Sequence, residues 1–181
     1  MIENVGIVGA GQMGGGIAHV VSLSGRKVYL LDIDQGLLTG SIQTIEKNMA
    51  RQASRGKVSE DDVKAALSRI ETGTDYSGFS NCDIVIEAAT ENEDVKRKIF
   101  EEISGFLSDH ALLATNTSSI SITRLASTTD RPEKFIGMHF FNPVPVMQLV
   151  ELIKGIATSQ ETFQTVKALS ESLGKTVAEA E

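Results

Sequence analysis

Short apolar runs alternate along the chain with longer stretches in which apolar residues recur every three or four positions. The runs predict β-strands and the longer stretches predict helices, an alternation typical of α/β folds. The predicted strands are Ile2–Val8, Lys27–Leu31, Ile70–Thr72, Asp83–Glu87, Ala111–Thr115, Phe135–Met138, Met147–Ile153 and Lys175–Ala180. Several of these runs are apolar throughout, as in strands that are buried on both faces. The pattern therefore predicts a doubly wound, mostly parallel sheet, with the run at 70–72 at an edge.

Two helices are predicted where a single crossover helix would be enough. An apolar stripe with helical spacing occupies residues 38–49, and Gly56 is suited to end that helix. Ser59 and Asp62 form a capping-box pair that starts a second helix. We interpret this helical hairpin as an insertion that serves a substrate. A similar pairing predicts that Thr158 caps the last helix.

The composition is that of an ordinary globular protein. The 181 residues are enough for one domain, residues 1–181, with a sizeable core. A net charge of −7 argues against a nucleic-acid or anionic-membrane partner. Cys82 is the single cysteine, and no run of residues is long and apolar enough to span a membrane. We expect no bound metal, because no cluster of ligands is visible, and a cytoplasmic location.

The segment Gly9-Ala10-Gly11-Gln12-Met13-Gly14 lies between the first predicted strand and the first predicted helix. Its Gly-x-Gly-x-x-Gly spacing is typical of the turn that holds a dinucleotide pyrophosphate in Rossmann-like folds. Gly9 suits the tight turn, Gly11 lets the backbone approach the phosphates, and Gly14 lets helix and strand pack closely. A plain strand–helix turn without a ligand is the alternative interpretation.

A carboxylate at the end of the second strand favours the nucleotide site. Asp32 follows the apolar run and lies 21 residues after Gly11. A carboxylate about 20 residues beyond the glycines binds the adenosine ribose hydroxyls in such sites. No arginine follows directly to bind a 2′-phosphate, because the next residues are Ile33 and Asp34. The cofactor predicted from these features is NAD.

Polar residues follow the later strands at the edge where parallel strands end. Glu87 and Glu91 are candidates by position, although Glu91 also suits the first turn of a helix. Lys96, Arg97 and Lys98 lie in the first turns of that helix, where the helix dipole disfavours cations, so a ligand role is favoured for one of them. Asn116 and Ser118 lie beyond the next strand, where capping of a helix is the alternative interpretation.

His139 stands apart from the other two histidines, for which structural roles suffice. It ends a predicted strand on the same sheet edge as the glycine turn, and Glu151 lies in the neighbouring apolar strand. A carboxylate within hydrogen-bond reach fixes the tautomer of an imidazole and stabilises its protonated form. Beside a nicotinamide, such a pair indicates redox chemistry between an alcohol and a ketone.

A basic stripe runs along the first helix of the hairpin. Lys47, Arg51 and Arg55 recur at intervals of four residues and so share one face. A solvated helix face is one interpretation of this stripe. The other is a docking surface for the phosphates of a large ligand.

Three segments resemble the L-3-hydroxyacyl-CoA dehydrogenases: Asn116–Ser119, Gly137–Met147 and Val150–Glu151. The segment 155–163 resembles the bacterial 3-hydroxybutyryl-CoA dehydrogenases in particular. The likeness extends from residue 1 to about residue 180. It implies an NAD-dependent oxidoreductase of fatty-acid and butanoate metabolism that interconverts (S)-3-hydroxyacyl-CoA and 3-oxoacyl-CoA.

The resemblance also implies roles for individual residues. His139 would be the catalytic base, Glu151 its orienting partner, Ser118 a hydrogen-bond partner of the substrate oxygen and Asn142 a neighbour of the nicotinamide. Cofactor contacts are implied for Gly9, Ala10, Gly11, Gln12, Met13, Gly14, Asp32, Glu91, Lys96, Asn116, Ser118 and Asn142. Contacts with the coenzyme A part of the substrate are implied for Asn48, Arg51, Arg55 and Lys96.

Members of this family continue into an all-helical domain that completes the acyl-CoA site and forms the dimer. The chain ends where that domain would begin, so we expect it to be the NAD-binding part of a longer, homo-oligomeric enzyme, with little activity by itself. Two other functions are considered: a nucleotide-binding module without catalysis, and a dehydrogenase of a smaller hydroxy acid.

Overall fold

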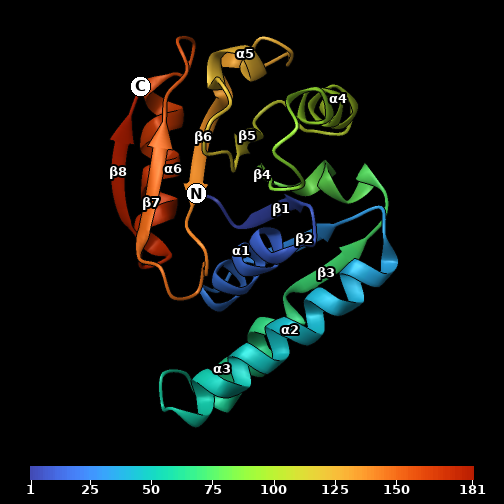
Figure 1. Cartoon of the computed structure of the whole chain (residues 1–181), viewed down its shortest axis with the longest axis vertical. Helices are drawn as coiled ribbons and strands as arrows, with labels where there is room; N and C mark the ends of the chain where they lie inside the picture. The colour runs from blue at the N-terminus through green and yellow to red at the C-terminus, as the bar shows by residue number, and fades with distance from the viewer.

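The computed structural model describes all residues from 1 to 181 and contains one eight-stranded sheet. The strands are β1 (Asn4–Val8), β2 (Lys27–Leu31), β3 (Ile70–Gly73), β4 (Ile84–Glu87), β5 (Leu112–Thr115), β6 (Phe135–Phe140), β7 (Leu149–Ile153) and β8 (Thr176–Ala180). Their order in the sheet is β3-β2-β1-β4-β5-β6-β7-β8, and β1 to β6 are mutually parallel (Figure 1). β7 is antiparallel to β6 and parallel to β8. The predicted doubly wound, mostly parallel sheet with an edge strand at 70–72 is confirmed, and that strand extends to Gly73.

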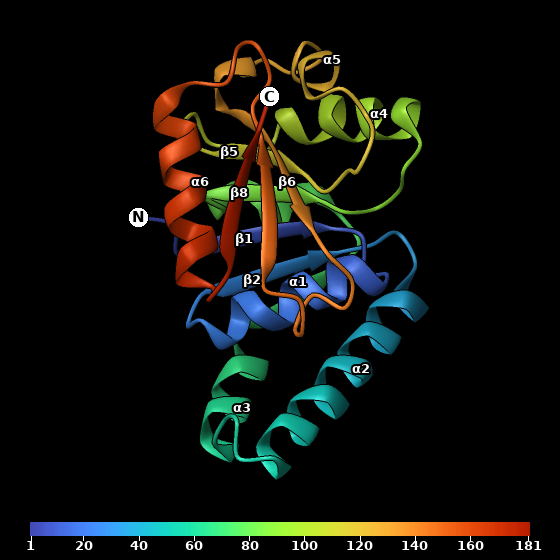
Figure 2. The same cartoon turned by 60° about the vertical axis from the view of Figure 1, so that its left-hand side comes forward.

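Helices cover both faces of this sheet. They are α1 (Gln12–Leu23), α2 (Gln35–Ser54), α3 (Glu60–Ser68), η1 (Tyr76–Asn81), α4 (Glu93–Ser104), α5 (Ile122–Ala126), η2 (Pro132–Lys134) and α6 (Gln160–Ser172). α6 packs along β6, β7 and β8 (Figure 2). None of the helices combines the length and the apolar character that crossing a membrane requires.

Alternation along the strands divides the core into two clusters, because successive side chains of a strand point to opposite faces. Ile84 and Ile86 pack with residues of α1, α2, α3 and α6. Val85, between them, packs with residues of η1, α4 and α5. Each central strand is thus buried on both sides, which explains its continuously apolar sequence.

The predicted helical hairpin consists of α2 and α3, which project beyond the sheet (Figure 1). Both helices pack against α1 and against each other. Gly56 follows the C-terminus of α2 with φ of +72°, a left-handed conformation that glycine adopts without steric cost. Ser59 and Asp62 form the predicted capping box of α3.

The structure corrects the predicted start of the last helix. Ser159, not Thr158, caps α6 by accepting a hydrogen bond from the backbone N–H of Thr162. The hydroxyl of Thr158 instead donates to the carbonyl oxygen of Phe135 and accepts from the N–H of Gly155. The short elements η1, α5 and η2 have no counterpart in the predicted pattern, because each is too short to display a helical period.

The carboxyl ends of four parallel strands meet at one edge of the sheet. Val8 pairs with Glu87, Glu87 with Thr115, and Thr115 with Gly137. The order of the strands reverses at β1: β2 and β3 follow on one side of it, and β4, β5 and β6 follow on the other. Ligands of such sheets bind beyond the carboxyl ends at this point of reversal.

Candidate functional site

The glycine turn joins β1 to α1 with the geometry that its sequence predicted. Gly9 has φ of +103°, and its N–H donates to the carbonyl oxygen of Leu31 at 2.8 Å. A Cβ placed on Gly14 would lie 1.7 Å from the carbonyl oxygen of Gly9, so this position excludes any side chain. A Cβ placed on Gly11 would meet no atom within 4 Å. Gly9 and Gly14 are therefore needed by the turn itself, whereas Gly11 leaves space in front of it.

The N-terminus of α1 is suited to bind an anion. No side chain caps this helix at its N-cap residue, Gly11. The first N–H groups of a helix have no partner within the helix, and the helix dipole favours negative charge beside them. A pyrophosphate group fits this environment, and the open space at Gly11 lets it approach the backbone.

Asp32 lies beside the turn at the end of β2. One carboxylate oxygen accepts from the N–H of Ala10 at 2.9 Å, and the other accepts from the N–H of Asp34 at 3.0 Å. The side chain is thereby held at the edge of the sheet in a half-buried position. The predicted proximity of this carboxylate to the glycine turn is confirmed, and its ribose contact stays a prediction.

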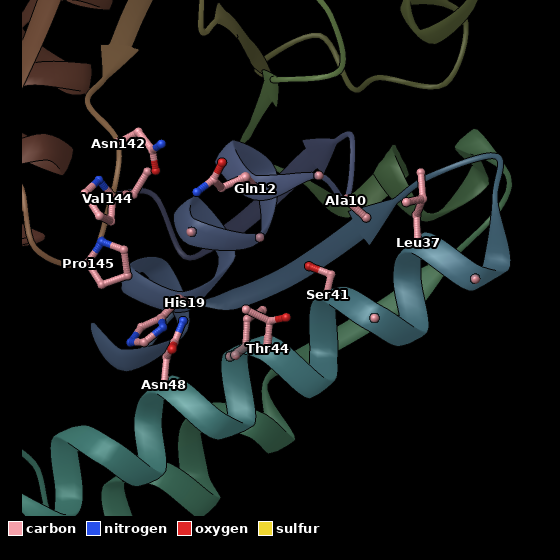
Figure 3. A pocket seen from close by; sticks show the side chains of 17 residues that line it. Ala10, Gln12, His19, Leu37, Ser41, Thr44, Asn48, Asn142, Val144 and Pro145 are labelled. Atoms are coloured by element: carbon pink, nitrogen blue, oxygen red, sulfur yellow. The ribbon is translucent and has the colours of Figure 1, made fainter.

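A groove of about 470 Å³ opens in front of the turn (Figure 3). It runs between α1, one face of α2 and the loop that follows β6. Ala10, Gly11 and Gln12 contribute the turn, and Asn142 contributes the loop. Met13 and Gly14, also predicted to contact the cofactor, lie outside its lining.

His139 and Glu151 face each other across the antiparallel pair formed by β6 and β7. The Nδ1 atom of His139 lies 3.2 Å from Oε2 of Glu151. The histidine side chain is 18% exposed and the glutamate side chain 39%. The ring of Phe141 lies against the imidazole, with 4.5 Å between the ring centroids. The predicted contact is confirmed, and the pair remains accessible to a substrate.

Asn116 and Ser118 lie beyond β5 on the same edge. The side-chain oxygen of Asn116 accepts from the N–H of Phe140 at 2.8 Å, next to His139 in the chain. Ser118 is exposed and lines a hollow of about 290 Å³ together with Glu151. The alternative interpretation, in which these residues cap a helix, is wrong because α5 starts later and is capped by Ser121.

The basic stripe of α2 lines a second hollow of about 830 Å³. Asn48, Arg51 and Arg55 are brought together there, as predicted, and Lys57 and Lys175 join them. No carboxylate lines this hollow, although the chain as a whole carries a net charge of −7. Lys47, in contrast, is exposed outside the lining, so part of the stripe is a solvated face.

Comparison with known proteins settles which fold family this site belongs to. Residues 4–181 match the family described as "3-hydroxyacyl-CoA dehydrogenase, NAD binding domain". The chain belongs to this family. The resemblance inferred from the sequence and NAD as the cofactor of the domain are thereby confirmed.

Individual relatives support the same assignment. The 3-hydroxybutyryl-CoA dehydrogenase of Bradyrhizobium diazoefficiens is 52% identical over 100% of this chain and 62% of that protein. Human mitochondrial hydroxyacyl-coenzyme A dehydrogenase is 40% identical over 97% of this chain and 58% of that protein. The crystal structure of (S)-3-hydroxybutyryl-CoA dehydrogenase from Ralstonia eutropha has a TM-score of 0.97 and 48% identity, over 99% of this chain and 63% of that one. The chain thus spans less than two thirds of the length of each relative.

Within this NAD-binding domain, Lys96 does not have the position expected of it. Its side chain is fully buried and forms an ion pair with Glu87, which is fully buried as well. The hydroxyl of Thr115 donates to the same Glu87 oxygen at 2.7 Å, and the N–H of Ala89 donates to the other at 2.8 Å. The prediction that Lys96 joins the arginines of α2 at coenzyme A is wrong, because its ammonium is held inside the protein beneath the sheet edge.

Glu91 does have an anchored position at that edge. Its carboxylate accepts a hydrogen bond from the hydroxyl of Thr117 at 2.9 Å, which links the loops after β4 and β5. Asn92, not Glu91, caps α4. The carboxylate is therefore fixed outside the helix, and the cofactor contact of Glu91 stays a prediction.

We expect Gly11→Ala and Gly14→Ala to have different effects. A methyl group at residue 11 points into the groove, so the variant should fold normally and bind NAD at least about tenfold more weakly, the equivalent of about 1.4 kcal/mol. A methyl group at residue 14 clashes with backbone, so that variant should lose stability as well. Calorimetric titration with NAD and thermal unfolding measure the two effects. Gly105→Ala, also in open space, is the control, and normal NAD binding by Gly11→Ala would contradict the assignment of the turn.

Lys96→Met should destabilise the fold even without any ligand. It leaves the Glu87 carboxylate buried without a cation, and breaking a buried pair in this way costs about 3–5 kcal/mol. Urea denaturation of the ligand-free chain measures the loss. Lys98→Met is the control, because Lys98 lies two residues away and is 75% exposed, so its pair with Glu102 contributes little. Equal stability of the two variants would return Lys96 to the role of a ligand contact.

Proposed function

We propose that the protein containing this chain is an NAD-dependent oxidoreductase that interconverts (S)-3-hydroxyacyl-CoA and 3-oxoacyl-CoA in fatty-acid and butanoate metabolism. 3-Hydroxybutyryl-CoA is the favoured substrate, because the relative of 52% identity bears that name. The observation that carries the proposal is the His139–Glu151 pair, which lies on the sheet edge where the glycine turn also ends. The cytoplasmic location and the homo-oligomer expected from the sequence stay predictions.

NAD is held by the turn and by Asp32. The free N–H groups at the start of α1 bind the pyrophosphate, and the carboxylate of Asp32 accepts hydrogen bonds from the adenosine ribose. A 2′-phosphate would meet the negative charges of Asp32 and Asp34 instead of an arginine, so NAD is preferred to NADP. When bound, NAD supplies the hydride acceptor for oxidation of the alcohol.

His139 moves the proton of the substrate hydroxyl. Its Nδ1–H donates to Glu151, which leaves Nε2 without a hydrogen and able to accept a proton. The negative charge of Glu151 then stabilises the imidazolium that forms. Ser118, on the loop after β5, donates its hydroxyl hydrogen to the substrate oxygen. In the reverse direction, His139 returns the proton to the oxygen of the ketone as it is reduced.

The coenzyme A part of the substrate binds along α2. The groove at the glycine turn and the basic hollow have His19, Asn48, Pro143 and Pro145 in common, so the two form one continuous surface. A long ligand is able to lie along this surface with its phosphates at Arg51 and Arg55. Arginine is suited to this contact because its guanidinium binds phosphate oxygens in a bidentate way.

Both other functions considered agree less well with the site. A nucleotide-binding module without catalysis would not require an accessible histidine with a carboxylate partner, as His139 and Glu151 are. A dehydrogenase of a small hydroxy acid has no use for a hollow of 830 Å³ lined by four cationic side chains, those of Arg51, Arg55, Lys57 and Lys175.

Replacement of His139 tests the mechanism. In the protein that contains this chain, His139→Ala should lower kcat for acetoacetyl-CoA reduction by about 10²–10⁴-fold, the usual contribution of general acid–base catalysis. Glu151→Gln should also lower kcat, and both variants should bind NAD normally. Steady-state kinetics and titration with NAD measure these effects. His110→Ala is the control, because that exposed histidine lies in a turn at the opposite end of the sheet. Near-normal turnover of the His139 variant would show that another residue moves the proton.

Replacement of the arginines tests the substrate class separately. Arg51→Ala and Arg55→Ala should each raise the KM for the acyl-CoA about tenfold, because each removes a charge-assisted contact with phosphate. NAD affinity should stay unchanged. Arg97→Ala, on the exposed face of α4, is the matched control. A parallel loss of NAD affinity, or no change in KM, would argue for a substrate without coenzyme A.

A further inference from the structure

Lys175 is a buried lysine without a carboxylate partner. It is 9% exposed and directly precedes β8, and no aspartate or glutamate forms an ion pair with it. Burial lowers the pKa of its ammonium group. A buried charge is costly unless hydrogen bonds compensate it. We therefore ask which hydrogen bonds compensate the burial of this ammonium group.

Both hydrogen bonds of the Lys175 ammonium group go to one loop. Its ammonium donates to the carbonyl oxygens of Val144 at 2.6 Å and of Met147 at 2.7 Å. Within the loop, the N–H groups of Val146 and Met147 both donate to the carbonyl oxygen of Pro143, at 3.0 and 2.9 Å. One ammonium group thus binds two carbonyls of the single turn that leads from β6 to β7.

The other side of this loop rests on α1. Val144 is buried, and a Cβ placed on Gly16 would lie 2.9 Å from the Cβ of Val144. Such a close approach is possible only because residue 16 has no side chain. The loop is therefore clamped between Gly16 on one side and Lys175 on the other.

The clamped loop forms one wall of the groove at the glycine turn. Asn142, Pro143, Val144 and Pro145 all line that groove (Figure 3). The same loop joins the strand of His139 to the strand of Glu151. Its position therefore determines the width of the groove.

We propose that Lys175 is a positioning residue: together with the contact between Val144 and Gly16, it fixes the loop 143–147 so that the NAD groove is shaped before the cofactor binds. This inference rests on the proposed function, since it assumes that the groove receives NAD. A loop that is already ordered loses little conformational entropy on binding, and the affinity gains accordingly. Without Lys175, the carbonyl oxygens of Val144 and Met147 lose this donor, and the loop becomes ordered only when NAD binds.

The test compares Lys175→Met with Lys134→Met in this chain. Lys134 also donates to a backbone carbonyl, that of Asp109, but on an edge of the protein away from the groove. Titration calorimetry should give a dissociation constant for NAD about tenfold higher for Lys175→Met, because the loop must then be ordered on binding, and an unchanged one for Lys134→Met. Hydrogen exchange of the Val146 and Met147 amides should accelerate in the first variant, with the amides of β6 unchanged. A general loss of stability would instead accelerate exchange throughout the sheet.

The variant Gly16→Ala tests the other contact of the loop, the one between Val144 and Gly16. The added methyl group must displace Val144, while alanine favours the helix more than glycine does, so the fold is kept. The same loop amides should exchange faster and NAD should bind more weakly. If Lys175→Met does not fold, the measurements on Gly16→Ala test the inference by themselves. Normal NAD affinity together with unchanged loop exchange, in either variant that folds, overturns the inference. Failure of the unchanged chain to bind NAD would refute the proposed function instead.

Discussion

The fully buried ion pair of Glu87 and Lys96 holds together the edge of the sheet at which the parallel strands end. The carboxylate ends β4, the ammonium comes from α4, and Thr115 at the end of β5 donates to the same oxygen. Each group is compensated only because the others are in place, so the three elements have little freedom to shift relative to one another. The glycine turn, Asn116 and the loop of Glu91 all extend from this edge. Their mutual positions therefore depend on a polar contact that is buried inside the protein.

The pairing of His139 with Glu151 depends on strand register instead. The two residues are 12 positions apart and meet because β7 runs back along β6 with His139 opposite Glu151. A shift of one residue in this register would turn one of the two side chains to the other face of the sheet. The N–H of Phe140, beside His139, donates to the side-chain oxygen of Asn116, which ties β6 to the loop after β5.

Much of this arrangement could be predicted from sequence, because the strands are apolar runs and the glycine turn has a fixed spacing. The burial of Lys96 could not, since its partner lies nine residues earlier on another element and only folding joins them. The burial of Lys175 could not be predicted either, because its partners are backbone carbonyls, which every residue has. Thr158 and Ser159 both offered a hydroxyl for the cap of α6, and the choice was made by the tertiary bond of Thr158 to Phe135. The contact of His139 with Glu151 was predictable because few chemical reasons place a carboxylate inside an apolar strand.

The groove at the glycine turn and the basic hollow share a wall, made by His19, Asn48, Pro143 and Pro145. His19 is itself buried and bonded to Gln52, which ties α1 to α2 at this wall. Two ligands that contact the same residues are thermodynamically linked whenever either of them moves those residues. Linkage is reciprocal: whatever free energy the first ligand adds to the binding of the second, the second adds to that of the first. The shared wall is therefore a route by which a ligand in the groove and a ligand in the hollow could affect each other's binding without any change in the sheet.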